Sequence, residues 1–250
     1  MSYTTLSLIH SRRFAGTKAP RKPLSLAATL VWGTAGIAAL MIFWITGQLP
    51  WQLGSHPVLV LVSFGHVAAL TMVMTALWFH GLPVRDTLAL PSLRWRDVSR
   101  GALFGVLGYL LLFFVYALIP LIQSALGGSA GVPAFLPPRL DGAGLTLVSL
   151  WFGMVVAAPI AEELLFRGLI YRGLSDSRLG ALGAVVLTSI AFGLVHYPGF
   201  GWPRVIGTAC IGLLFGWLRW HGGNTWAGMV AHAVMNLMGA ALLTVFVLVS

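Results

Sequence analysis

Long runs of apolar residues divide this 250-residue sequence, and most of each run is free of charged side chains. A helix needs about 20 apolar residues to cross the hydrocarbon layer of a bilayer. Seven runs approach that length, near residues 24–47, 57–79, 101–122, 145–167, 181–198, 203–220 and 225–249. Only 8% of the residues are charged, whereas a soluble domain carries about 25%. We therefore predict an all-α fold, a polytopic transmembrane helix bundle of about seven spans, with eight as the alternative.

Two details of the later runs affect the packing of the bundle. The fifth and sixth runs are short, and Pro198 and Pro203 bracket the turn expected between them. The sixth run also contains Gly207, Gly212 and Gly216. Small residues let the backbones of membrane helices approach closely. We expect the sixth helix to make such close contacts.

Basic residues lie mainly between the runs and predict the orientation in the membrane. The chain has 15 Lys and Arg against six Asp and Glu, a net charge of +9. The basic residues cluster in the N-terminal tail and after the second, fourth and sixth runs, whereas the alternate segments hold only Arg139 and Arg204. The positive-inside rule then predicts a cytoplasmic N-terminus and, with seven spans, a C-terminus outside. We expect a multi-pass protein of the inner (plasma) membrane that contacts lipid and does not bind nucleic acid.

Composition divides the chain into four segments. Residues 1–23 form a basic tail expected in the cytoplasm, and residues 24–123 hold the N-terminal transmembrane helices. Residues 124–143 form a loop rich in Gly and Pro, which could gate access to a site. Residues 144–250 form the helical core in which we expect the catalytic residues, because the unusual polar residues lie there.

The only two glutamates of the chain are adjacent and lie within an apolar run. Glu162 and Glu163 are followed by Arg167, four residues after Glu163. An ionisable group at the centre of a membrane helix costs about 2.5–3.5 kcal/mol even on the mildest scale, so such groups are candidates for function. Glu163 and Arg167 share a helical face and form a predicted ion pair. Glu162 points elsewhere without a local cation, which suggests an intramembrane polar cavity and suits a general base.

Two histidines lie within later runs and bring further polar positions. His196 ends the fifth run, with Phe192 one turn earlier on the same face. His232 and Asn236 share a face of the last run. A single membrane histidine is usually a packing residue, and His66 in the second run is interpreted in that way. The glutamate pair, His196, His232 and Asn236 together make four polar positions on three separate runs, and this combination instead indicates a site.

These residues suit the hydrolysis of a peptide bond. A carboxylate and an imidazole can together hold and deprotonate a water molecule that attacks a carbonyl carbon. We assign Glu162 as the base and His196 as its partner on the water. His232 and Asn236 carry N–H groups that can stabilise the oxyanion. Glu163 and Arg167 support the helix and its electrostatic field.

A catalytic zinc ion is the alternative chemistry. Two histidines and one glutamate match the number of protein ligands of a catalytic zinc, and Glu162, His196 and His232 would be those ligands. The sequence has no His-Glu-x-x-His motif, and the three residues come from separate runs. We expect no cofactor and keep zinc as the alternative.

The three motifs together resemble a known family of intramembrane proteases. Glu162-Glu163-Leu-Leu-Phe-Arg167, then Phe192-Gly-Leu-Val-His196, then His232-Ala-Val-Met-Asn236 are similar to motifs of the CPBP family. This is the CAAX-prenyl-protease and bacteriocin-processing group, also called Abi, and the resemblance extends over residues 145–240. It implies a helical bundle with a membrane cavity and endopeptidase activity near the C-terminus of a substrate. It also implies the roles given above to the glutamate, the histidines and the asparagine.

One geometric difficulty accompanies this assignment. A helix rises 1.5 Å per residue, so His196 lies about 24–27 Å from the start of its span near residue 180. Glu162 lies only about 15 Å from Arg172, which is at the same side of the membrane. For His196 and Glu162 to meet, the fifth span must tilt, begin later or be broken.

The leading functional hypothesis is an intramembrane endopeptidase. Its partner would be a membrane-anchored or transmembrane peptide or protein, of the CAAX-like, bacteriocin or C-terminal sorting-signal type. The alternative is a non-catalytic membrane protein, either an immunity protein or a scaffold that binds a peptide partner. A transporter in which the buried acids relay protons comes third, because the sequence has no internal repeat.

Overall fold

The computed structural model describes residues 24–52, 58–125, 148 and 151–249. The tail 1–23, and the loop 124–143 apart from its first two residues, therefore lie outside the described residues. Within the described part every regular element is a helix. The N-terminal half contains α2 (Leu26–Gln52), α3 (Val58–Phe79), the short α4 (Val84–Thr87) and α5 (Trp95–Ala125). The C-terminal half contains η2 (Phe152–Ala157), α7 (Ala158–Glu163), η3 (Leu164–Ile170), α8 (Tyr171–Ser175), α9 (Gly180–Leu194), α10 (Tyr197–Gly222) and α11 (Trp226–Val249).

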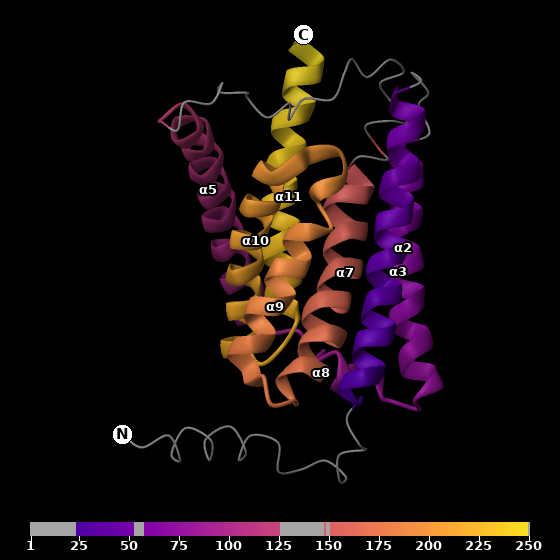
Figure 1. Cartoon of the computed structure of the whole chain (residues 1–250). Helices are drawn as coiled ribbons and strands as arrows, with labels where there is room; N and C mark the ends of the chain where they lie inside the picture. Colours follow the sequence, from indigo (N-terminus) through magenta and orange to yellow (C-terminus); the bar gives the residue numbers. More distant parts are fainter. Residues whose placement is uncertain (1–23, 53–57, 126–147, 149–150, 250) are drawn as a thin grey trace.

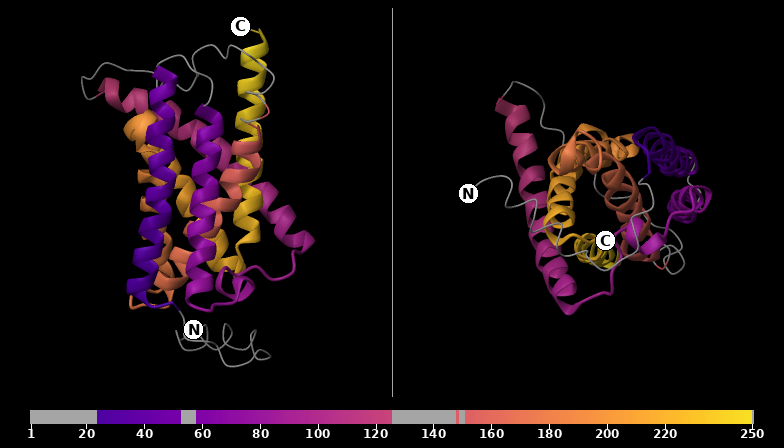
Figure 2. Two further views of the ribbon diagram at one scale, coloured as in Figure 1. Left: turned by 90° about the vertical axis from the view of Figure 1, so that its right-hand side faces the viewer. Right: turned by 90° about the horizontal axis from the view of Figure 1, so that it is seen from below.

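The long helices stand side by side and alternate in direction along the chain (Figure 1). Helices α2 and α3 pack as a pair on one side, and α5 lies on the other (Figure 1, Figure 2). The continuous helix from η2 to α8, together with α9, α10 and α11, fills the space between them. The C-terminal half of the chain therefore forms the centre of the bundle.

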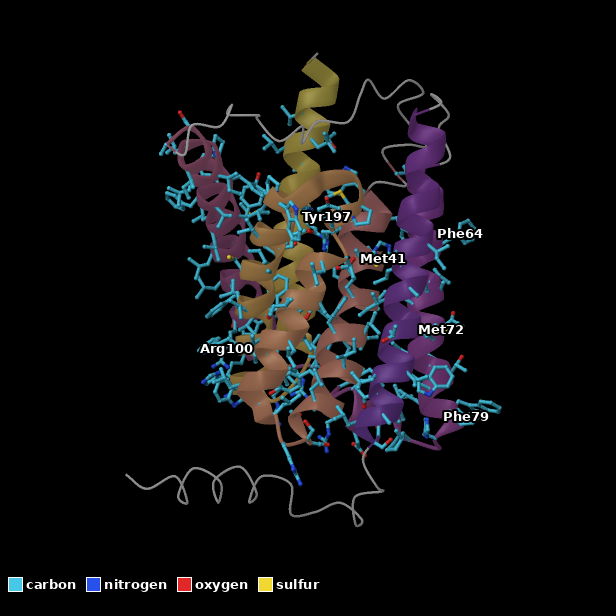
Figure 3. The ribbon with its side chains drawn as sticks, viewed as in Figure 1. Met41, Phe64, Met72, Phe79, Arg100 and Tyr197 are labelled. Atoms are coloured by element: carbon cyan, nitrogen blue, oxygen red, sulfur yellow. The ribbon has the colours of Figure 1, made fainter. Side chains whose placement is uncertain are left out.

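The outer surface of the bundle is apolar, as a lipid-facing surface must be. Phe113 and Phe114 of α5 are 65% and 62% exposed, and Phe64 and Phe79 of α3 project away from the bundle (Figure 3). A soluble protein rarely exposes apolar patches of this extent, whereas in a bilayer these side chains contact lipid tails. The architecture is that of a helical membrane bundle.

Helix lengths bear on the predicted number of spans. Within the described residues, Trp95–Ile122 and Trp226–Val245 are long and apolar enough to cross a bilayer. The stretches Leu26–Ile42, Phe64–Phe79 and Gly180–Leu194 are apolar but shorter. Each of the seven predicted runs overlaps one long helical segment, although the boundaries differ by several residues. The count of seven spans stays a prediction.

The predicted turn between the fifth and sixth runs lies within α10 rather than before it. Helix α10 begins at Tyr197, so Pro198 occupies its first turn and Pro203 lies inside it. Proline fits the first turn of a helix because no backbone N–H is needed there. The φ of Gly201 is +68°, a left-handed conformation that glycine adopts most readily. The change of chain direction therefore occurs between the two prolines, as predicted, but the helix begins earlier.

The glycines of α10 bring it close to its neighbours, as expected. A Cβ atom on Gly212 would lie 2.9 Å from Ser189 of α9, and one on Gly216 would lie 2.9 Å from a side-chain atom of Val185. Glycine at these positions lets α9 and α10 pack with their backbones in close approach. The carbonyl of Gly212 also accepts a hydrogen bond from Arg167, on the helix that carries the glutamates.

The glutamate pair lies at the centre of a helix whose winding changes twice. Segments η2 and η3 are π-helical, and the α-helical turns of α7 between them carry Glu162 and Glu163. Pro159 in the first turn of α7 has no N–H to donate to a carbonyl of the preceding turn. Looser π-helical winding is frequent at functional sites because it changes the direction of side chains. The unusual winding here brackets the two acidic residues.

Candidate active site

Glu162 is buried and forms a hydrogen bond with a histidine from the N-terminal half of the chain. Its Oε1 atom lies 3.0 Å from Nε2 of His66 in α3. The exposed fractions of Glu162 and His66 are 5% and 4%. The interpretation of His66 as a packing residue was therefore wrong, and Glu162 has a partner that sequence spacing did not reveal.

Glu163 and Arg167 form the ion pair that the sequence predicted. Arg167 donates through a terminal nitrogen to Glu163 Oε1 at 2.9 Å, and both side chains are fully buried. The other terminal nitrogen of Arg167 donates to the backbone carbonyl of Gly212 at 3.0 Å. The guanidinium carbon lies 4.4 Å from the ring centroid of Phe192. A cation–π contact of this kind is stronger in a dry environment, so the arginine is held on three sides.

His232 of α11 approaches both glutamates. Its Nε2 atom lies 4.0 Å from Glu162 Oε2, and its Nδ1 atom lies 3.4 Å from Glu163 Oε1. Neither approach has hydrogen-bond geometry, and Nδ1 has no hydrogen-bond partner. The ring of Phe215 lies at its side, with centroids 5.4 Å apart. His232 therefore faces the two carboxylates from the opposite helix.

His196 lies between α9 and α10, where the chain changes helix. Its Nδ1 atom is 2.8 Å from the backbone carbonyl of Phe192, which only accepts, so Nδ1 carries the proton. Nε2 is then the basic nitrogen of this ring. The ring of Phe192 lies 5.1 Å from His196 and 5.8 Å from His232. Phe192 therefore contacts both predicted catalytic histidines and Arg167.

Helix α9 runs without a break from Gly180 to Leu194, and His196 follows two residues after its end. The span therefore neither begins later nor is broken before His196. No ion pair within 4.0 Å joins His196 to Glu162 among the described residues, although the charge of Glu162 acts on the imidazole. Of the three expected solutions, a tilt of the span is the one left, and it stays a prediction.

Asn236 ties α11 to the π-helical segment before the glutamates. Its amide nitrogen donates to the carbonyl of Met154 in η2 at 2.8 Å. A π-helical segment leaves carbonyl groups that need external donors. The role of Asn236 as an oxyanion donor stays a prediction, since the amide is engaged with the backbone in this arrangement.

Several buried polar atoms of the site lack hydrogen-bond partners within the described structure. They are Glu162 Oε2, Glu163 Oε2, His66 Nδ1, His232 Nδ1 and Arg167 Nε. Buried polar atoms are nearly always hydrogen-bonded, to protein or to water. A separation of 4.0 Å between Glu162 Oε2 and His232 Nε2 allows one water molecule to bridge them. The site is polar and suited to water, whereas the expectation of a wider cavity stays a prediction.

The described side chains bear on the zinc alternative. No group of three His, Cys, Asp or Glu residues in the described part of the chain could hold one. Both the metal-free mechanism and the zinc alternative stay predictions for experiment.

The described residues form a helical bundle, consistent with a membrane protein, in which buried carboxylates lie beside imidazoles. Comparison with protein families agrees: residues 144–238 match the family described as type II CAAX prenyl endopeptidase, Rce1-like. Over this segment the chain is similar to the CPBP family of intramembrane proteases. No curated protein and no solved structure matches it. The family resemblance drawn from the three motifs is confirmed, and all three lie inside the matched segment.

Proposed function

We propose that this protein is an intramembrane endopeptidase in which Glu162 activates water for attack on a peptide bond. The observation that carries the proposal is the environment of the Glu162 carboxylate. One oxygen accepts a hydrogen bond from His66, while the other lies 4.0 Å from His232 without a partner. A buried carboxylate with one anchored and one available oxygen is suited to orient and deprotonate a water molecule.

In the proposed reaction the water lies at Glu162 Oε2. The carboxylate accepts one proton of the water as the water oxygen attacks the carbonyl carbon of the scissile bond. The basic Nε2 of His196 is the predicted second acceptor of the water. Collapse of the tetrahedral intermediate breaks the C–N bond, and the proton passes from Glu162 to the leaving amine. No covalent acyl-enzyme forms.

His232 is the proposed donor to the developing oxyanion. Its Nε2 atom lies beside Glu162 Oε2, so a carbonyl attacked there would place its oxygen within reach of the imidazole. Donors already oriented toward developing charge stabilise a transition state strongly in a dry site. Asn236 is proposed as a second donor, which would require its amide to turn from Met154 or to use its second hydrogen.

The buried ion pair supports this arrangement. The charge of Glu163 is balanced by Arg167, whose guanidinium is fixed by Gly212 and Phe192. Because the charge of Glu163 is neutralised locally, the site carries one uncompensated carboxylate rather than two. Repulsion between adjacent carboxylates would otherwise oppose the ionised form of the base.

The substrate class follows from the family and from the surface of the bundle. A membrane-associated protein or peptide is the substrate that the family implies. The CAAX-like, bacteriocin and C-terminal sorting-signal types are the candidates that we propose within this class. We propose that the substrate approaches through lipid or carries a membrane anchor, and the apolar outer surface of the bundle supports this.

We propose that the protein lies in the plasma membrane with its N-terminus in the cytoplasm. Most basic residues of the described chain lie at the end of the bundle where α8 leads to α9 and α10 leads to α11 (Figure 1). They are Arg85, Arg94, Arg96, Arg100, Arg172, Arg178 and Arg219. The positive-inside rule supports a cytoplasmic location for this end, where α2 also begins (Figure 1).

The proposal is tested by cleavage of membrane-anchored C-terminal reporter peptides in detergent. Wild type is compared with Glu162→Gln, which keeps the shape of the side chain and removes the base. We expect the variant to lose at least about 10²-fold in kcat, the lower end of the contribution of a general base. Cleavage by Glu162→Gln at the rate of wild type would refute the proposal.

Chelation and a cell-based protection assay separate the alternatives. Activity that is insensitive to a zinc chelator supports the glutamate mechanism, and activity abolished by chelation and restored by zinc supports the metal alternative. If the protein is a non-catalytic immunity or scaffold protein, the Glu162→Gln variant and the His232→Ala variant should each still protect cells fully against the toxin. Loss of protection in both variants supports catalysis.

A further inference from the structure

Helix α3 presents one ionisable residue to the interior of the bundle, and that residue is His66. Between Val58 and Phe79 the sequence contains no other ionisable residue. His66 shares its face of the helix with Ala69 and Val73, which are fully buried, whereas Val67 next to it is 54% exposed. A polar side chain in an otherwise apolar interface of a membrane helix is costly. It therefore needs a partner or a role.

The partner of His66 differs in kind from those of His196 and His221. His196 and His221 each bond the backbone carbonyl four residues earlier on their own chain segment. Such local bonds satisfy a packing histidine without any tertiary partner. His66 instead reaches across 96 residues of sequence to Glu162 Oε1 at 3.0 Å. Its hydrogen bond is directed at the proposed base.

The direction of this hydrogen bond follows from the chemistry of the two groups. An ionised carboxylate has only acceptor atoms, so Nε2 of His66 carries the proton and donates. Hydrogen bonds to a charged acceptor are about twice as strong as neutral ones. The bond therefore fixes the carboxylate plane and leaves Oε2 as the oxygen that faces His232. Without the bond, Glu162 would be free to rotate about its terminal torsion, which is broad for this side chain.

We propose that His66 is a positioning residue that orients Glu162, with Oε1 anchored to α3 and Oε2 aimed at the water. This inference rests on the proposed function of Glu162 and extends the active site to the N-terminal half of the chain. His66 lies outside the segment 144–238 that matches the protease family. The C-terminal segment therefore carries the base, while α3 decides how the base is oriented.

The test uses two substitutions of nearly equal shape. Glutamine at this position keeps an N–H donor at about the reach of the histidine Nε2, and methionine has a similar length and no donor. We expect His66→Gln to stay within about fivefold of the wild-type kcat. His66→Met should lose about 10²-fold in kcat with little change in KM, because a misplacement near 1 Å has a cost of that order.

Three comparisons complete the experiment. His80→Met changes another histidine, one that follows α3 and bonds Trp32 at 3.1 Å, and it should leave kcat unchanged. Tryptophan fluorescence during thermal unfolding shows whether each variant is folded. If His66→Met does not fold, the shorter His66→Asn replaces it, since its amide stops short of Glu162 and the same loss of kcat is expected.

The outcomes distinguish this inference from the proposed function. A folded His66→Met variant within about threefold of wild-type kcat would overturn the positioning role, since a 1 Å error costs far more. Equal losses in His66→Gln and His66→Met would also overturn it, because a donor would then be irrelevant. In both cases an inactive Glu162→Gln variant leaves the proposed function intact, whereas an active one refutes that function.

Discussion

Replacement of Arg167 by methionine removes a positive charge from the centre of the bundle while keeping an unbranched side chain. The guanidinium makes an ion pair with Glu163 at 2.9 Å, donates to Gly212 O at 3.0 Å and lies 4.4 Å from the Phe192 ring. Loss of one partner from a buried pair costs about 3–5 kcal/mol because the other charge is left uncompensated. A desolvated cation–π contact adds about 2 kcal/mol.

We therefore expect Arg167→Met to lower the free energy of unfolding by about 4 kcal/mol or more. This loss is a large fraction of the free energy of unfolding of a typical protein, which is about 5–15 kcal/mol. Unfolding is measured in detergent micelles by titration with a denaturing detergent. The ten tryptophans of the chain provide the fluorescence signal.

The same helical segment offers a matched control. Arg172 and Asp176 also form an ion pair four residues apart, at 2.7 Å, but their side chains are 42% and 29% exposed. An exposed pair contributes about 0–1 kcal/mol, so Arg172→Met should change the unfolding free energy by less than about 1 kcal/mol. Equal losses in the two arginine variants would refute the reasoning from burial.

A double variant tests the cause of the loss. Glu163→Gln combined with Arg167→Met removes both charges, so no carboxylate is left buried without a cation. The double variant should be more stable than the sum of the single losses predicts, with a coupling of about 1–3 kcal/mol for residues in contact. Strictly additive losses would show that the two side chains do not form the pair.

Two further substitutions test the packing around the site. A Cβ on Gly228 would lie 2.8 Å from Glu163 Oε2, so Gly228→Ala should lower the unfolding free energy by about 1–3 kcal/mol. A Cβ on Gly239 of the same helix meets nothing within 4 Å, so Gly239→Ala should leave the unfolding free energy unchanged. Similar denaturation curves for the two variants would contradict this prediction. Asn224 accepts from the N–H of Trp226 at the start of α11 and donates to buried Asp97 at 3.0 Å. Asn224→Ala should cost about 2–4 kcal/mol in the same assay, and a cost below about 1 kcal/mol would show that the cap and the bond contribute little.

The helical architecture and most site residues could be predicted from the sequence because both depend on local patterns. Hydropathy along the chain locates helices wherever about 20 apolar residues follow one another. The spacing of four residues predicted that Glu163 and Arg167 would pair, since that spacing brings side chains to one helical face. Family motifs confined to residues 144–238 are local in the same sense.

Tertiary structure alone decided what Glu162 and Asn236 touch. Nothing in the spacing of residues 66 and 162 indicates that they meet, because their contact depends on how α3 packs against α7. The engagement of Asn236 with Met154 likewise depends on the π-helical winding of η2, which hydropathy does not report. Adjacent glutamates point about 100° apart on a helix. The four-residue spacing pairs Glu163 with Arg167, whereas the packing of α3 and α11 alone decides that one oxygen of Glu162 bonds His66 and the other faces His232 without a hydrogen-bond partner.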